Sequence, residues 1–246
     1  MVIVCVFYHP MKLKSFLKRL FTFGETLEIV KSPINGEIKV VDDLFGDRSM
    51  IIGGVSQSGG LVTKLWETAI KNVPSFKFPV SSCLILGLGC GNAAKIVADK
   101  FPGCKIIGVE IDPKVVEIGK KYFRLGEVKN LKIITGDAIK YIENLNHHPL
   151  ITNPKSLITK YDLIIVDLYL GQDFLTTAET KNFIHKTKSM LSKNGLIIFN
   201  RLYYGKKKKE TGKFSDYLKK YFNVVKTKKT VTNLLIYCQT INNIIS

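Results

Sequence analysis

Short apolar runs alternate, from residue 81 onward, with segments whose apolar residues recur at helical spacing. The runs consist mainly of Ile, Leu and Val, which is typical of strands buried on both faces of a parallel sheet. This alternation predicts an α/β fold with a doubly wound, mostly parallel sheet. We expect strands at residues 83–88, 105–110, 131–135, 161–167 and 196–200.

Capping and turn residues place helices between these strands. Asp112 can cap a helix that has Pro113 at its first position. Thr176 and Glu179 form a capping box, and Asn194-Gly195 is a helix stop signal. We expect helices at 92–101, 113–122, 137–145, 176–193 and 214–221, a surface loop over 146–160, and a terminal antiparallel pair at 222–226 and 234–240.

The pattern before residue 81 is different. Short alternating runs at 27–30, 37–41 and 50–52 are separated by turn signals, and a helical pattern over 61–70 contains the only tryptophan, Trp66. Pro74 and Pro79 then mark a linker. We therefore divide the chain into a basic amphipathic segment (1–26), a small β-hairpin appendage with a linker helix (27–80) and an α/β domain (81–246).

The first segment combines two patterns. Residues 2–8 are apolar, but no basic residue precedes them, so they make a poor signal peptide. Residues 11–21 have the spacing of a basic amphipathic helix, which can lie on an anionic membrane or pack on its own domain. We favour packing. Met11 is an alternative start to Met1.

Composition narrows the class of protein. No apolar run approaches the roughly 20 residues that cross a bilayer, and five scattered cysteines without metal-ligand spacing are typical of reduced thiols in the cytoplasm. His147 and His148 also lack ligand spacing, so no metal site is predicted. The net charge of +17 indicates a nucleic-acid partner only weakly, because just four of the 37 basic residues are arginine.

The glycines after the first predicted α/β strand are the main candidate for chemistry. Gly87, Gly89 and Gly91 follow that strand, and Glu110 ends the next one. Glycines let backbone N–H groups approach a ligand at a helix N-terminus, and an acid at this spacing can bind ribose hydroxyls. A tight turn without a ligand is the alternative. Asn92 replaces the last glycine of the dinucleotide pattern, which favours a mononucleoside such as S-adenosylmethionine over NAD.

Three acids fall at the carboxyl ends of successive strands. Glu110, Asp137 and Asp167 each follow an apolar run. These strand ends line one crevice in an open parallel sheet, and ligands bind there. The sequence therefore predicts that the glycine loop and the three acids converge.

These segments resemble the spermidine synthase-like group of class I S-adenosylmethionine-dependent transferases, which have a Rossmann-like fold. The resemblance extends from about Ile38 to Val225 and rests on five segments: GGVSQSGG (53–60), GLGCGN (87–92), VEIDP (109–113), GDA (136–138) and YDLIIVDLY (161–169).

The resemblance implies a role for each matching residue of the cofactor site. Glu110 would hold the ribose hydroxyls and Ile111 would pack against the adenine. Asp137 would accept from the adenine amino group, with Ala138 beside it. The loop 87–91 would approach the methionine portion of S-adenosylmethionine, or of its decarboxylated form.

The resemblance also implies how the acceptor is handled. Asp167 corresponds to the acid that orients and deprotonates the attacking amine, with Tyr169 and Asp173 as supporting candidates. Gln57 would reach the nucleoside from the N-terminal segment. Tyr169 has an alternative reading as a packed loop residue.

Three departures separate the chain from true aminopropyltransferases. Cys90 stands where they carry an acid, residues 168–171 replace their aspartate-proline pair, and their tyrosine–histidine region is absent around 62–67. Residues 206–209 are four lysines, expected in a solvated loop at the mouth of the crevice, where they would repel a polycation. We therefore expect a methyltransferase acting on an unidentified small-molecule acceptor.

Two other functions stay open. One is an aminopropyltransferase that uses decarboxylated S-adenosylmethionine and makes spermidine. The other is a non-catalytic nucleoside- or nucleic-acid-binding protein, because residues 201–209 interleave aromatic and basic side chains. The sequence also leaves open whether the protein forms a homodimer.

Overall fold

The computed structural model describes residues 24–73, 80–143, 160–171 and 173–240. Its centre is a seven-stranded sheet in the order β12-β13-β11-β8-β5-β6-β7. The strands are β5 (Ser82–Leu86), β6 (Lys105–Glu110), β7 (Leu131–Thr135), β8 (Tyr161–Val166), β11 (Leu191–Leu202), β12 (Val224–Lys229) and β13 (Asn233–Gln239). Strands β7, β6, β5, β8 and β11 are parallel, and β13 and β12 continue the sheet antiparallel. The predicted doubly wound, mostly parallel fold is confirmed.

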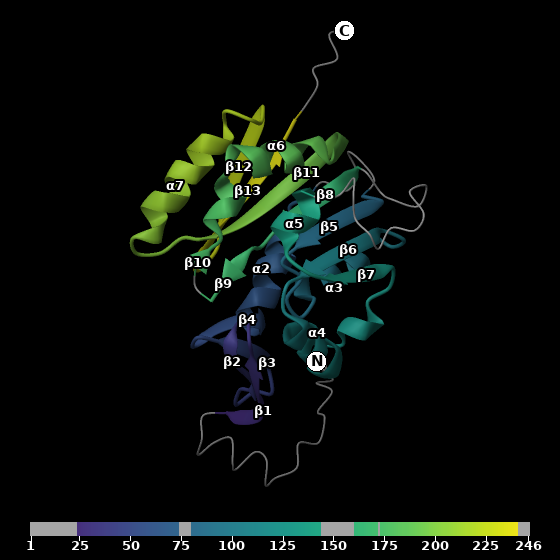
Figure 1. Ribbon diagram of the computed structural model, residues 1–246, viewed down its shortest axis with the longest axis vertical. Coiled ribbons are helices and arrows are strands. Elements are labelled where there is room, and N and C mark those ends of the chain that lie inside the picture. The colour runs from purple at the N-terminus through teal and green to yellow at the C-terminus, as the bar shows by residue number, and fades with distance from the viewer. Residues whose placement is uncertain (1–23, 74–79, 144–159, 172, 241–246) are drawn as a thin grey trace, which may run out of the picture.

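The central strand β5 explains why helices cover both faces of this sheet. Its alternate residues enter two cores: Cys83 and Ile85 face one, Leu84 and Leu86 the other. The first core is completed by α2 (Gly60–Lys71) and α3 (Asn92–Lys100). The second is completed by α5 (Ala138–Glu143), α6 (Lys181–Ser189) and α7 (Lys207–Leu218), which lie together in Figure 1.

A separate antiparallel sheet forms the predicted β-rich appendage. It contains β1 (Glu25–Ser32), β2 (Gly36–Asp42), β3 (Arg48–Ile52) and β4 (Val55–Gly59), paired in chain order. The polar strand β4 was not predicted, because its short run has no apolar alternation. Residues of β2 and β3 pack on α4 (Pro113–Tyr122), which places this sheet at one end of the molecule (Figure 1).

Two hydrogen bonds connect this sheet to the glycine loop. The Ser58 hydroxyl accepts from the backbone N–H of Cys90 (3.1 Å), and the Asn92 side-chain oxygen accepts from that of Gly59 (3.2 Å). The predicted Asp112 cap is present, with its carboxylate accepting from the backbone N–H of Lys114 (2.9 Å). Strand β4 therefore lies directly against the loop that follows β5.

Two predicted helix boundaries were wrong. Residues Thr176–Glu179 form a 3-10 turn, η3, and Thr180 caps α6 by accepting from the backbone N–H of Phe183 (3.3 Å). Glu179 pairs with Arg201 instead of completing a capping box. The Asn194-Gly195 pair lies inside β11, because α6 already ends at Ser189.

The lysine run also differs from its prediction. Residues 206–209 were expected in a flexible loop, and they form the N-cap and first turn of α7, which begins seven residues before the predicted Phe214. Thr211 anchors this extension by donating to the backbone oxygen of Leu202 (2.8 Å). The predicted terminal antiparallel pair is confirmed as β12 and β13.

Several predictions fall on residues that the structure does not describe. The amphipathic helix and Met11, the proline linker and the histidine-containing loop lie in 1–23, 74–79 and 144–159. The domain boundaries therefore stay predictions. Within the described residues, no helix is long and apolar enough to cross a bilayer, and no group of three or more His, Cys, Asp or Glu side chains could hold a metal.

Candidate nucleoside-binding and transfer site

A cavity of about 120 Å³ lies where β5, β6 and β8 end and the N-terminal sheet approaches them. Sequence reasoning predicted nine site residues, and the structure brings eight of them to this cavity. They are Gln57, Gly87, Gly89, Glu110, Ile111, Asp137, Ala138 and Asp167. Gly91 lies outside the lining.

Glu110 at the end of β6 fixes the glycine loop. The side chain is buried, with one oxygen accepting from the backbone N–H of Gly89 (2.8 Å) and the other from that of Asp112 (3.1 Å). Burial raises the pKa of Glu110, and the backbone hydrogen bonds oppose that shift. The carboxylate thus supports the loop and still faces the cavity.

Two of the loop glycines combine a positive φ with neighbours that leave no room for a side chain. Gly87 has φ +87°, and a Cβ there would lie 2.1 Å from the backbone oxygen of Asp167. Gly91 has φ +91°, and its Cβ would lie 2.4 Å from the Leu125 side chain. Gly91 is therefore explained by a tight turn without a ligand. Gly87, in contrast, allows β5 and the end of β8 to approach each other at the cavity wall.

Asp137 caps α5 at the far end of the cavity. Its Oδ1 accepts from the backbone N–H groups of Ile139 (2.7 Å) and Lys140 (3.3 Å). No other hydrogen bond of this carboxylate is found among the described residues, so its second oxygen is available to a ligand. Ile111, which is 43% exposed, and Ala138 line the cavity nearby.

Asp167 directly follows β8 and is held by an amide relay. Its Oδ1 accepts from the side-chain amide of Asn200 (2.8 Å), whose own oxygen accepts from the amide of Asn233 (2.9 Å). Burial, opposed by the Asn200 hydrogen bond and aided by the charge of Glu110, raises the pKa of Asp167 to about 7. An oriented carboxylate with this pKa is suited to take a proton near neutral pH.

Tyr169 and Asp173 were the two supporting candidates. The Tyr169 hydroxyl donates to the backbone oxygen of Asn200 (3.1 Å) and accepts from the backbone N–H of Leu202 (2.9 Å). Burial raises the pKa of Tyr169 far above its ordinary value, so this wall residue stays neutral. Asp173 does not line the cavity; it pairs with Lys207 (2.9 Å).

The N-terminal sheet supplies the opposite wall. Gln57 of β4 donates through its side-chain amide to the backbone oxygen of Gly171 (2.8 Å), and so spans the cavity mouth. Asn35, between β1 and β2, also lines the cavity and donates to the Asp112 carboxylate (2.7 Å). Asn35 is not among the predicted site residues, because the Asn35-Gly36 pair indicates only a turn when it is read along the chain.

Cys90, in the glycine loop, is a packed core residue. Its sulfur lies 3.3 Å from that of Met50, and burial raises the pKa of the thiol to about 12. It is therefore a neutral thiol. The other described cysteines, Cys83, Cys104 and Cys238, are also buried and unbridged.

A glycine loop after the first α/β strand, with acids at the ends of the next strands around one crevice, is the arrangement of the class I methyltransferase fold. A solved spermidine synthase from Thermotoga maritima has this fold, with a TM-score of 0.67 and 16% identity over 89% of this chain and 74% of its own. The family model described as spermine/spermidine synthase domain matches residues 63–246. The chain belongs to the spermine/spermidine synthase family.

Its curated relatives divide between two kinds of transferase. A polyamine aminopropyltransferase of Vibrio vulnificus is 32% identical over 48% of this chain and 36% of its own length. An eEF1A lysine and N-terminal methyltransferase of Mus musculus is 30% identical over 48% of this chain and 16% of its own length. The chain therefore spans about a third or less of these relatives, which transfer different groups.

Proposed function

We propose that this protein transfers a methyl group from S-adenosylmethionine to an amine. The observation that carries the proposal is the position of Asp167, a buried carboxylate with a pKa of about 7, at the cavity that Glu110 and Asp137 also line. Such a group supports transfer to an amine, because an ammonium must lose its proton before it can act as a nucleophile.

The cavity residues fit an adenosine. Each carboxylate oxygen can accept two hydrogen bonds, and each Glu110 oxygen uses one for the backbone, so both can also accept from ribose hydroxyls. The second oxygen of Asp137 would accept from the adenine amino group, and the exposed apolar side chain of Ile111 would pack on the ring. When bound, S-adenosylmethionine would supply a methyl group activated by its sulfonium.

The protein would contribute alignment and proton removal. Asn200 holds the Asp167 carboxylate in one orientation, and Asn233 holds Asn200. The acceptor nitrogen, once deprotonated by Asp167, would face the methyl group in line with the bond that breaks. Neutral Tyr169 and the Gln57 amide would border its approach.

Two observations favour methyl over aminopropyl transfer. Cys90 is neutral and buried, so the glycine loop has no acid that would repel the carboxylate of intact S-adenosylmethionine. The Lys206–Lys209 run stands at the start of α7, where it disfavours a polycation such as putrescine. The family and the Vibrio vulnificus relative keep aminopropyl transfer as the second candidate.

Calorimetry and product analysis test both candidates. We expect S-adenosylmethionine to bind more tightly than its decarboxylated form, and amine-bearing acceptors to yield S-adenosylhomocysteine. Tighter binding of the decarboxylated form, with methylthioadenosine and spermidine produced from putrescine, would establish the second candidate instead. Failure to bind either nucleoside would contradict both.

A further inference from the structure

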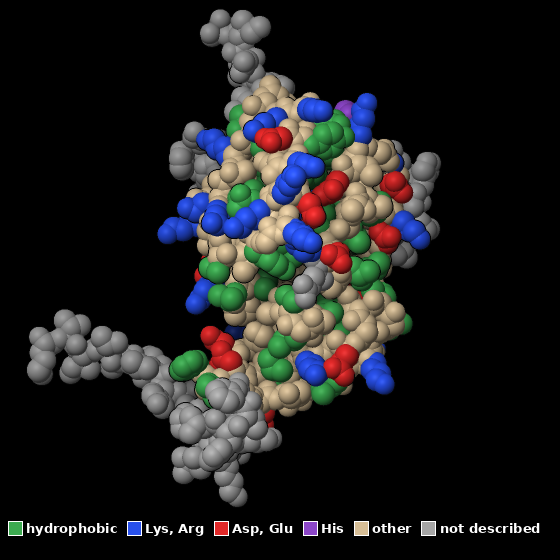
Figure 2. Space-filling model, turned by 90° about the vertical axis from the view of Figure 1, so that its left-hand side faces the viewer, with side chains coloured by type: hydrophobic (Ala, Val, Ile, Leu, Met, Phe, Trp, Pro, Cys, Tyr) green, Lys and Arg blue, Asp and Glu red, His purple; other side chains and the backbone are tan. Residues whose placement is uncertain are grey.

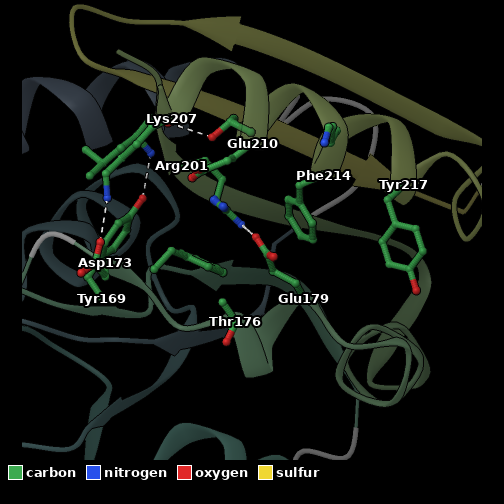
Figure 3. Close-up of a pocket in the computed structure, with 13 residues that line it drawn as sticks. Tyr169, Asp173, Thr176, Glu179, Arg201, Lys207, Glu210, Phe214 and Tyr217 are labelled. Carbon is green, nitrogen blue, oxygen red and sulfur yellow. Dashed lines mark hydrogen bonds and ion pairs between the residues drawn. The ribbon is translucent and has the colours of Figure 1, made fainter. Parts of the chain in front are cut away.

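A second and larger cavity, of about 630 Å³, adjoins the nucleoside cavity (Figure 3). Tyr169 lines both. The larger cavity lies between the hairpin of β9 (Tyr169–Leu170) and β10 (Asp173–Phe174), the η3 turn, the end of β11 and one side of α7. Arg201 and Leu202 on its wall directly follow Asn200, which holds Asp167. The larger cavity therefore borders the residues that hold Asp167, although Asp167 itself lines the nucleoside cavity.

Three acids line this outer cavity, and two of them, Glu179 and Asp173, are neutralised, whereas Glu210 lies among the lysines in the first turn of α7. Glu179 pairs with the buried guanidinium of Arg201, and Asp173 pairs with Lys207. The guanidinium also lies over the rings of Phe174 and Phe214, with its carbon 4.0 and 4.8 Å from the ring centroids. Arg201 is thus occupied on its edge and its faces, and serves as a structural part of the wall.

Four lysines at or near the start of α7 are not neutralised in the same way, and of these Lys213 lines the outer cavity. Lys206, Lys208, Lys209 and Lys213 form no ion pair with any residue in the part of the chain that the structure describes. Residues 201–231 contain eleven basic and two acidic residues, so this segment carries more than half of the net charge of +17. Figure 2 shows many Lys and Arg side chains on the upper half of the face that includes α7.

The position of the lysine run argues against a purely structural role. Residues 206–209 stand at the N-terminus of α7, where the helix dipole is positive and cations are unfavourable. The first turn would be more stable with acids or with neutral capping residues. The run therefore produces a positive potential at the cavity at some cost in helix stability, as an anion-binding surface requires.

We propose that the outer cavity and these lysines dock an acidic polypeptide segment, whose amine enters past Tyr169 to reach Asp167. This inference rests on the proposed function. The aromatic walls formed by Phe174, Phe214 and Tyr217 suit an amphipathic peptide, and the unpaired lysines suit its acidic side chains. A lysine side chain or N-terminus needs a base such as Asp167, whereas the amino groups of nucleobases are already neutral.

Peptide binding tests the charge complementarity. The probe is a fluorescein-labelled 15-residue peptide of Glu and Ala with one central lysine, followed by anisotropy in low salt. We expect Lys208→Glu/Lys209→Glu to weaken binding about tenfold or more. The matched control, Lys120→Glu/Lys132→Glu, makes the same charge change at two exposed sites in α4 and β7, away from the lysine run of α7, and we expect it to leave binding within about twofold.

A neutral substitution tests the cavity itself. Thr176 lines the outer cavity, whereas the exposed neighbour Thr177 does not. We expect Thr176→Trp to weaken peptide binding and Thr177→Trp to leave it unchanged. Methyl transfer from labelled S-adenosylmethionine to the peptide lysine should follow the same order, and a peptide with arginine at that position should stay unlabelled.

The contrary outcomes are distinct. The proposal would be overturned if the peptide does not bind, or if both charge reversals weaken its binding equally. It would also be overturned if a 15-nucleotide single strand binds more tightly than the peptide and Lys208→Glu/Lys209→Glu weakens that binding. The last result would assign the surface to nucleic acid. Calorimetry with S-adenosylmethionine distinguishes a failure of the docking proposal from a failure of the proposed function, because cofactor binding should survive all four variants. A wild-type protein that binds the peptide but not the cofactor would contradict the transferase proposal alone.

Discussion

The two neighbouring cavities are built in different ways. Around the nucleoside cavity, Glu110 and Asp137 are held by backbone N–H groups, so the positions of their carboxylates follow from the ends of strands and helices. Around the outer cavity, Glu179 and Asp173 are held by the side chains of Arg201 and Lys207. A site built on the backbone suits a ligand common to a fold, whereas a site built on side chains can change its specificity with a few substitutions.

Asp167 lines the nucleoside cavity and is the proposed base, so its removal should have the largest effect on transfer. Asp167→Asn keeps the shape but cannot take a proton, and we expect the turnover rate to fall about 10³-fold. Calorimetry should show cofactor affinity within about threefold of wild type, because the variant leaves Glu110 and Asp137 intact. Activity near the wild-type rate would exclude Asp167 as the base.

A substitution of Glu110 should affect the nucleoside cavity and leave the outer cavity unchanged. Glu110→Gln retains the size of the side chain but loses the charge-assisted hydrogen bonds, and we expect the Kd for S-adenosylmethionine to rise about 10- to 100-fold. Binding of the acidic peptide to the outer cavity should be unchanged. Equal losses at both cavities would mean that the variant unfolds the crevice, which circular dichroism would reveal.

The raised pKa of Asp167 predicts two opposite pH dependences. Transfer needs the carboxylate, so the rate should fall about tenfold per pH unit below the pKa of about 7. The folded state keeps its proton between about pH 4 and 7, where the unfolded chain has lost it, so the free energy of unfolding should fall as pH rises through this range. Urea unfolding measures this slope, which Asp167→Asn should reduce.

Of these substitutions, that of Gln57 should have the smallest effect. Its amide bond to Gly171 joins the N-terminal sheet to the hairpin that separates the cavities. We expect Gln57→Ala to weaken cofactor binding only severalfold, about 1 kcal/mol, because one neutral hydrogen bond is lost at a half-buried position. A neighbouring substitution, Ser56→Ala, serves as the control, since Ser56 does not line the cavity.

The amino-acid sequence alone determined the sheet and the convergence of its polar ends. The apolar runs around Leu84, Ile107 and Ile164 could only be buried strands, and the chain direction of parallel strands then put Glu110, Asp137 and Asp167 at one edge. These features depend on local periodicity and on topology, which a single sequence records.

Only the tertiary structure decided which local signals prevail. Glu179 completes a capping box in the sequence, but in the fold it pairs with Arg201, which is 22 residues away and brought close by β11. Lysines 206–209 have the pattern of a solvated loop, yet Thr211 and Phe214 pack against β11 and extend α7 through them. Asn35 reaches the cavity because β1 and β2 fold back on α4. Long-range contacts of this kind outweigh local propensities of a few tenths of a kcal/mol, so the outer cavity could not be derived from spacing along the chain.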